Sequence, residues 1–227
     1  MKINHPLVKG VVKEIKPNIY CVLVDDNYDR AMLFCRYQEF YESPYKIFRN
    51  KYFTWMEYMR FYKDAWKKKT FTYPEDWSGY NIPCNILQVA HHQFCGETEY
   101  DDIMNSIYFH CANDATEKND GTRCDWYLIG ASSKDLKTLD HEIAHGLYFT
   151  NKDYKRDVNK LIKGIKPTHY DKLKKKLMKM GYVNDKKIID DEIQAFMSTG
   201  LYNGLDTKEL KKYETGFVKN FKKYRNG

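Results

Sequence analysis

Short runs of apolar residues predict a small number of β-strands in the first 131 residues. Residues 11–15 (VVKEI) and 18–24 (NIYCVLV) are rich in strand-forming side chains, and the turn-forming Pro17 lies between them. The apolar runs 84–90 (CNILQVA) and 126–131 (WYLIGA) are also short enough to be buried strands. We therefore expect a strand pair followed by two further strands in a small sheet.

Helical periodicity appears between these runs. Apolar residues recur every three or four positions over residues 29–41, and again over residues 54–69. Residues 70–83 contain proline, glycine and tryptophan and resemble a loop, while residues 112–125 are polar and rich in turn formers. The N-terminal part of the chain is therefore predicted to be mixed α/β.

Downstream of the last predicted strand, the pattern is helical to the end of the chain. Ser132 and Asp135 have the spacing of a capping box, which predicts a helix that runs to about residue 148. Pro167 is typical of a helix start, and Gly200 of a helix end. The other helices are predicted over about 152–164, 167–180, 186–199 and 207–225.

Together these elements predict an α+β protein with two lobes and a cleft between them. Residues 1–150 are expected to form a mixed α/β lobe, and residues 151–227 a helical lobe. A chain of 227 residues is long enough for one large domain or two small ones. Hydrophobic residues make up 42% and charged residues 30% of the chain, which excludes wholesale disorder.

The sequence carries no sign of a membrane or secreted protein. No apolar run approaches the roughly 20 residues that a membrane-spanning helix needs. The first residues lack the apolar segment and small-residue cleavage site of a secretory signal. We therefore expect a cytoplasmic protein, which would act in the host cytoplasm if it is viral.

The net charge of +7 is unevenly distributed. Residues 151–227 contain 20 Lys and Arg against 10 Asp and Glu, whereas residues 1–150 contain 18 against 21. Because the lysines interrupt apolar helix patterns, we interpret most of them as solvated helix faces, with nucleic acid or an acidic partner as the alternative. The high aromatic content, 16%, is interpreted mainly as core packing.

The six cysteines lack the paired spacing of a zinc ribbon or of a disulfide framework. With no secretory signal, we expect six reduced thiols, none of which binds zinc. A second group of metal ligands can be assembled from nearby residues, but its spacing matches no standard site. Its members would be His91, His92, Cys95, His110 and Cys111.

The motif that carries chemistry is His-Glu-Ile-Ala-His at residues 141–145. Positions i and i+4 share one face of a helix, so His141 and His145 can both reach one metal ion. Glu142 is rotated by about 100° from His141 and can address a metal-bound water from the side. The motif therefore predicts a metal site with Glu142 beside a metal-bound water.

The helix around this motif is amphipathic. Leu136, Leu139, Ile143 and Leu147 form an apolar stripe that can pack on the predicted sheet. Thr138, His141, His145 and Tyr148 form roughly the opposite stripe. The histidines are therefore expected to face a cleft.

A catalytic zinc site needs a third protein ligand and an open position for water. Residues 148 and 151 are Tyr and Asn, where a metzincin would have Gly and His. The remaining candidate is a carboxylate on a later helix, and Glu192 best satisfies this because Ala195 and Thr199 share its face. His169 is the rival ligand. Asp191 points about 100° away from Glu192, so the two are not expected to bind the same ion.

The combination of HEIAH with the downstream segment DEIQA (191–195) resembles the gluzincin branch of zinc metallopeptidases. The resemblance implies a zincin-like fold, one zinc ion per chain, His141, His145 and Glu192 as its ligands, and Glu142 as general base. Some gluzincins carry an aspartate four residues after the ligand glutamate, but Phe196 stands there. More loosely, HEIAHGLYFTN (141–151) and FTYPEDWSGYNIP (71–83) resemble proteins of large phages and some bacteria.

Several roles stay open at this stage. The carboxylate that orients a zinc-bound histidine is Asp140, Asp190 or Asp191. The donor that stabilises an oxyanion is one of a group near the motif in sequence, namely His169, Tyr170, Tyr182 and Tyr202.

The expected function is hydrolysis of a peptide or protein substrate. Two alternatives are a zinc hydrolase that acts on a substrate other than a peptide, and a binding or virion component with a silent zinc site. The sequence predicts neither the substrate nor the oligomeric state.

Overall fold

The computed structural model describes residues 1–200 and 205–226, and within them the protein is α+β, with ten helices and one mixed five-stranded sheet. The strands are β1 (Lys2–Asn4), β2 (Lys9–Lys16), β3 (Ile19–Leu23), β4 (Tyr80–Pro83) and β5 (Tyr127–Ala131), in the sheet order β1-β2-β3-β5-β4. Strands β3 and β5 run parallel, and the other neighbours are antiparallel. The predicted strand pair is confirmed as β2 and β3.

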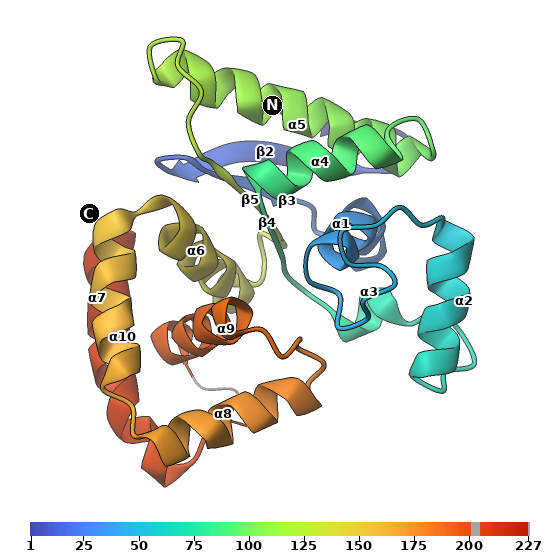
Figure 1. Cartoon of the computed structure of the whole chain (residues 1–227). Helices are drawn as coiled ribbons and strands as arrows, with labels where there is room; N and C mark the ends of the chain where they lie inside the picture. Colours follow the sequence, from blue (N-terminus) through green and yellow to red (C-terminus); the bar gives the residue numbers. More distant parts are fainter. Residues whose placement is uncertain (201–204, 227) are drawn as a thin grey trace.

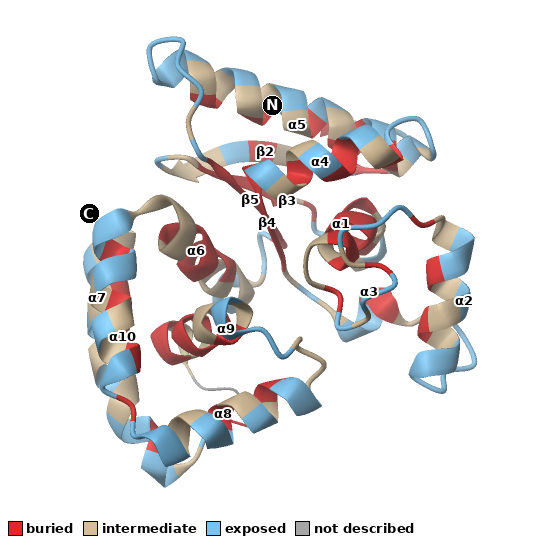
Figure 2. Ribbon diagram, viewed as in Figure 1, coloured by how far each residue is buried: buried red, intermediate tan, exposed pale blue. Residues whose placement is uncertain are grey.

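Both faces of the sheet are covered by helices (Figure 1). Side chains alternate along β3, so Tyr20 and Val22 belong to one hydrophobic cluster while Ile19 and Cys21 belong to the other. The first cluster contains side chains of α1 (Asn27–Glu42), α2 (Trp55–Ala65), α3 (Tyr73–Asp76), α4 (Cys84–Phe94) and α5 (Glu99–Lys118). Figure 2 shows buried positions concentrated in the strands and on the inward sides of these helices.

The second cluster joins the other face of the sheet to the C-terminal helices. These are α6 (Leu136–Thr150), α7 (Lys152–Lys163), α8 (Pro167–Lys179), α9 (Lys186–Thr199) and α10 (Lys208–Asn226). Helix α6 lies alongside α9, and α10 packs against α7 and α9. Helix α6 also contacts β3, β4 and β5, so it lies between the sheet and the helices that follow it.

One predicted strand is wrong. Residues 84–90 form the start of helix α4, not a strand. Pro83 has no backbone N–H and ends β4, and it then serves as the N-cap residue of the helix. Leu87, Ala90 and Phe94 are buried on one side of α4, which is the spacing of a helix rather than of a strand.

The polar stretch before β5 and the loop before α4 also contain regular structure. Helix α5 extends to Lys118 through the first half of residues 112–125, because Cys111 and Ala115 continue a buried stripe that begins at Ile103. Within residues 70–83 lie the short helix α3 and strand β4.

The start of the HEIAH helix differs from the capping-box prediction. Asp135, not Ser132, is the N-cap residue, and its side chain accepts a hydrogen bond from the backbone N–H of Thr138. Leu136 is 68% exposed, so the apolar stripe begins only at Leu139.

The long helices are not membrane spans. None of the described helices combines the length with the apolarity that crossing a bilayer requires.

Candidate metal centre

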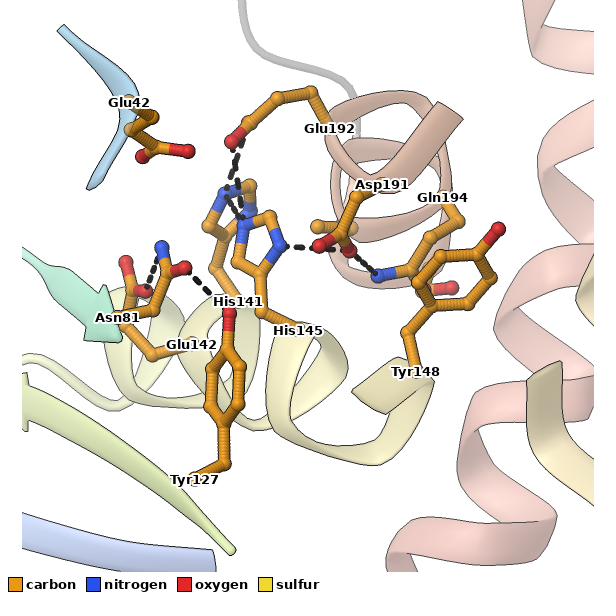
Figure 3. A network of polar contacts seen from close by, with 12 residues as sticks. Glu42, Asn81, Tyr127, His141, Glu142, His145, Tyr148, Asp191, Glu192 and Gln194 are labelled. Atoms are coloured by element: carbon orange, nitrogen blue, oxygen red, sulfur yellow. Dashed lines mark hydrogen bonds and ion pairs between the residues drawn. The ribbon is translucent and has the colours of Figure 1, made fainter. Parts of the chain in front are cut away.

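The two histidines of the motif and Glu192 come together between α6 and α9 (Figure 3). The Nε2 atoms of His141 and His145 are 3.3 Å apart. Glu192 directs one oxygen to each ring, Oε1 at 3.6 Å from His145 Nε2 and Oε2 at 3.8 Å from His141 Nε2. Among the described residues, these three form the one group of side chains found with metal-ligand spacing.

These separations suit a tetrahedral zinc ion. Bonds of about 2.0–2.2 Å in tetrahedral geometry place neighbouring ligand atoms about 3.3–3.6 Å apart, and the observed separations of 3.3, 3.6 and 3.8 Å lie in or just above this range. Glu192 is only 2% exposed, and no hydrogen-bond partner of its Oε2 atom is found among the described residues. A buried carboxylate oxygen without a donor costs free energy unless a cation satisfies it. The donor set and this orphaned oxygen therefore fit a metal ion.

Asp191 orients His145 from behind. Its Oδ1 atom lies 2.9 Å from His145 Nδ1 and also accepts a hydrogen bond from Gln194 Nε2. The Tyr154 hydroxyl in turn donates to Gln194 Oε1 at 2.8 Å. A proton held on Nδ1 by the carboxylate leaves the Nε2 lone pair free to bind a metal. Of the three aspartates considered as orienting groups, Asp191 is the one beside a motif histidine.

The neighbouring carboxylates change the pKa of His145. Burial lowers the pKa of this imidazole, but Asp191 and Glu192 outweigh that effect and hold the pKa well above its ordinary value. A divalent cation bound at Nε2 would meet the same attraction from the carboxylates.

His141 is held differently. Its Nδ1 atom lies 3.5 Å from the hydroxyl of Thr199, which itself donates to the backbone carbonyl of Ala195. The Phe196 ring lies beside the imidazole, with 4.5 Å between ring centroids. A threonine hydroxyl and an aromatic wall therefore take the place of a second carboxylate.

Glu142 lies beside the ligand group and not within it. Its side chain is buried and accepts a hydrogen bond from Asn81 Nδ2 at 3.1 Å, while the Tyr127 hydroxyl donates to Asn81 Oδ1 at 2.7 Å. Burial raises the pKa of Glu142, although the nearby histidines oppose this shift. A Cβ atom on Gly79 would fall 2.2 Å from Glu142 Oε1, so only glycine leaves room for the carboxylate.

Two adjoining cavities lead to these residues. The inner cavity, of about 70 Å³, is lined by the two histidines, Glu142 and Glu192 together with side chains of the N-terminal half. The outer cavity, of about 600 Å³, shares His141 and Glu142 with it and extends towards Met180 and Phe196. Tyr182 lines both cavities.

The hydroxyl of Tyr182 is hydrogen-bonded to the Glu192 carboxyl group. Burial, followed by the charges of Glu192, Glu42 and Glu142, raises the pKa of its phenol well above the ordinary value. The hydroxyl therefore keeps its proton at neutral pH.

The other candidates near the motif lie elsewhere. His169 Nδ1 lies 2.9 Å from the Tyr213 hydroxyl, and His169 lines neither cavity. The Tyr170 hydroxyl donates to Asp190 Oδ1 at 2.7 Å. Tyr202 lies outside the described residues.

Asp140 and the second imagined ligand group are also remote from the site. Asp140 accepts a hydrogen bond from Arg225 Nε at 3.0 Å. His91 Nδ1 lies 2.8 Å from Asn105 Oδ1, and its ring stacks on Tyr108. All six cysteines are free.

Three residues of the site were missed by sequence reasoning. Glu39 and Glu42 of α1 and Asn81 of β4 line the inner cavity. The sequence signal for Glu39 and Glu42 was that two glutamates lie on one side of a helix rich in aromatic residues. Periodicity alone predicts that such glutamates face solvent. Asn81 carried no signal, because its strand was predicted as loop.

Comparisons with models of protein families, with curated proteins and with solved structures give no match for this chain. What the site can do is therefore inferred from its own geometry and chemistry.

Proposed function

We propose that this protein is a zinc-dependent peptidase with a zincin-like active site. His141, His145 and Glu192 would hold one zinc ion, and Glu142 would be the general base. The observation that carries the proposal is the orphaned Oε2 atom of Glu192, which is buried within 3.8 Å of His141 Nε2 and has no donor among the described residues. The resemblance of HEIAH and DEIQA to gluzincin motifs points to the same chemistry.

A bound zinc ion supplies a water of lowered pKa and polarises the scissile carbonyl group. Asp191 keeps the proton of His145 on Nδ1, which fixes the orientation of the ring. Thr199 and Phe196 restrict the ring of His141.

The remaining steps belong to Glu142 and Tyr182. Glu142 accepts the proton of the attacking water and returns it to the leaving amine, while Asn81 holds one of its oxygens in place. Its raised pKa favours this role, because a base with a pKa nearer to neutrality can both take and release the proton. The Tyr182 hydroxyl donates to the oxyanion that develops on the substrate carbonyl.

The experiment compares zinc content and peptide cleavage for wild type, Glu142→Gln and His145→Ala, with a peptide library as substrate. Glu142→Gln is nearly isosteric and should keep one zinc ion per chain, yet lose activity by about 10²–10⁴-fold. His145→Ala should lose both zinc and activity, because two ligands are too few for a stable catalytic site.

His169→Ala and Glu75→Gln are the matched controls, since one removes a remote histidine and the other an exposed carboxylate. Both should retain zinc and activity. If Glu142→Gln cleaves as fast as wild type, the proposed mechanism is wrong. If wild type binds zinc but cleaves no peptide, while it hydrolyses another class of ester or amide, the substrate class is wrong.

A further inference from the structure

The inner cavity extends beyond the metal-ligand group into a chamber built by the N-terminal half. Its walls are largely aromatic, and two carboxylates of α1, Glu39 and Glu42, also line it. The aromatic wall residues are Tyr45, Tyr58, Tyr62, Trp66, Tyr73, Trp77, Tyr80 and Tyr182.

Glu42 faces the ligand group from the opposite side of this chamber. Figure 3 shows its carboxyl group directed toward Glu192 and the two histidines. The side-chain amide of Gln38 donates a hydrogen bond to Glu42, and no salt bridge to Glu42 is found among the described residues. Glu42 therefore lies beside the ligand group without belonging to it.

The chamber is lined by several carboxyl groups and by no lysine or arginine among the described residues. Lys68 and Lys137 line the outer cavity instead. Four carboxyl groups line the inner cavity, those of Glu39, Glu42, Glu142 and Glu192. Burial raises the pKa of Glu39, Glu42 and Glu142, so these groups would gain most from the arrival of a cation. An enclosed site with uncompensated carboxylates attracts a cation from outside.

The shape of the chamber limits which cation it can take. A volume of about 70 Å³ accommodates a group of roughly five water-sized positions, since one water occupies about 10–15 Å³ on this measure. Aromatic faces bind a desolvated ammonium group through cation–π attraction, and a carboxylate adds an ion pair. A primary ammonium group with a short alkyl stem meets both requirements.

We propose that the inner cavity is a specificity pocket for a primary ammonium group of the substrate, and that Glu42 is the residue that binds it. The term specificity pocket rests on the proposed peptidase function, but the binding of an ammonium group can be measured without catalysis. Two parts of a peptide supply this chemistry, the N-terminal α-amine and the side chain of lysine. The first would give removal of N-terminal residues, and the second would give cleavage next to lysine.

The test is calorimetric binding of three small probes to the zinc-loaded protein. Norleucine methylamide carries only an α-ammonium group, Nα-acetyl-lysine methylamide carries only the side-chain ammonium group, and Nα-acetyl-norleucine methylamide carries neither. We expect at least one charged probe to bind tenfold or more tightly than the neutral probe. Which charged probe binds identifies the source of the ammonium group.

Glu42→Gln should abolish this preference, because the amide keeps the size of the side chain and removes its charge. Glu39→Gln tests the second carboxylate, and Glu75→Gln removes an exposed charge from α3 as the matched control. The inference is overturned if the neutral probe binds equally well, if no probe binds at millimolar concentration, or if Glu42→Gln keeps the preference. A second zinc ion that disappears in Glu42→Gln would also overturn it, since Glu42 would then be a metal ligand.

Failure of the peptidase proposal is read separately, from zinc content and cleavage by wild type and Glu142→Gln. If the protein binds the charged probes through Glu42 but hydrolyses no peptide, the ammonium pocket is supported and the peptidase proposal is contradicted.

Discussion

Asp191 and Glu192 are neighbours in the sequence but act on different sides of the same histidine. Successive residues of a helix point about 100° apart. Glu192 reaches His145 Nε2 from the front at 3.6 Å, while Asp191 reaches Nδ1 from behind at 2.9 Å. One turn of α9 therefore supplies both a candidate ligand and the group that orients another ligand.

Asp191→Asn should weaken zinc binding by about 10–100-fold, because the neutral amide holds the Nδ1 proton of His145 less strongly. Competition with a chromophoric chelator measures the affinity directly. Asp190→Asn is the matched control, since the Asp190 carboxylate accepts from Tyr170 and pairs with Lys186 instead. Equal loss of affinity in the two variants would contradict the role of Asp191.

Glu39 gives a pH dependence to the stability of the fold. Burial raises its pKa from 4.5 to about 7, although hydrogen bonds from Ser43, Tyr58 and Tyr73 oppose this shift. As the pH rises from about 4.5 to 7, the unfolded chain loses this proton before the folded one does. The free energy of unfolding should therefore fall by about 3 kcal/mol across this range.

Urea denaturation of wild type and Glu39→Gln at pH 5 and pH 8 measures the effect. The glutamine variant should lose less stability than wild type between the two pH values, because its side chain does not ionise. Glu75→Gln, which changes an exposed side chain, should follow wild type. A wild-type difference that is unchanged in Glu39→Gln would assign the pH dependence to other groups.

At the scale of elements, the site depends on how closely α6 approaches the sheet. Gly146 follows His145 directly, and a Cβ atom there would fall 2.9 Å from the side chain of Ile19 on β3. Glycine therefore allows α6 to pack closely against β3, and this contact sets the distance of the two histidines from the sheet. Helix α9 then brings Glu192 to them from the other side.

Gly146→Ala should destabilise the protein by about 1–3 kcal/mol, because overpacking of the buried Ile19 outweighs the better helix propensity of alanine. Gly216→Ala on α10 is the matched control. Its new Cβ atom would fall 3.2 Å from Leu161 Cδ2, the end of a flexible side chain, so the variant should gain up to about 1 kcal/mol. Thermal denaturation of both variants measures the change in stability, which should be negative for Gly146→Ala and positive for Gly216→Ala. A stabilised Gly146→Ala would contradict this packing argument.

At the scale of the whole molecule, the candidate metal joins parts that are distant in sequence. His141 and His145 come from α6, Glu192 from α9, and the cavity is closed by residues of α1 and β4. A ligand that binds only the folded chain stabilises it in proportion to its free concentration.

Zinc at about 100 times its dissociation constant should add about 2.7 kcal/mol to the free energy of unfolding. For a chain of this size that corresponds to a rise in Tm of about 5–10 °C. Scanning fluorimetry with zinc, and with zinc removed by a chelator, measures the shift. His145→Ala should show no such rise, and an equal rise in that variant would place the zinc elsewhere.

The sequence by itself determined the strand pair β2 and β3, most of the long helices, and the three residues proposed as metal ligands. Helical spacing sufficed for α2 and the five helices from α6 onward, because each presents an amphipathic repeat, and for α1, where apolar residues recur every three or four positions. The His-x-x-x-His spacing sufficed to put His141 and His145 on one face, since that geometry is local to a helix. Glu192 could be named because a carboxylate with small neighbours on a later helix is a recognisable pattern.

Only the tertiary structure decided what surrounds these residues. Whether residues 84–90 formed a strand or a helix depended on Pro83 and on burial against α5, which a short apolar run does not reveal. The choice of Asp191 over Asp140 and Asp190 depended on how α9 is rotated against α6. Glu42 and Asn81 reach the site across more than 50 residues of chain, and such long-range proximity leaves no periodic signal in the sequence.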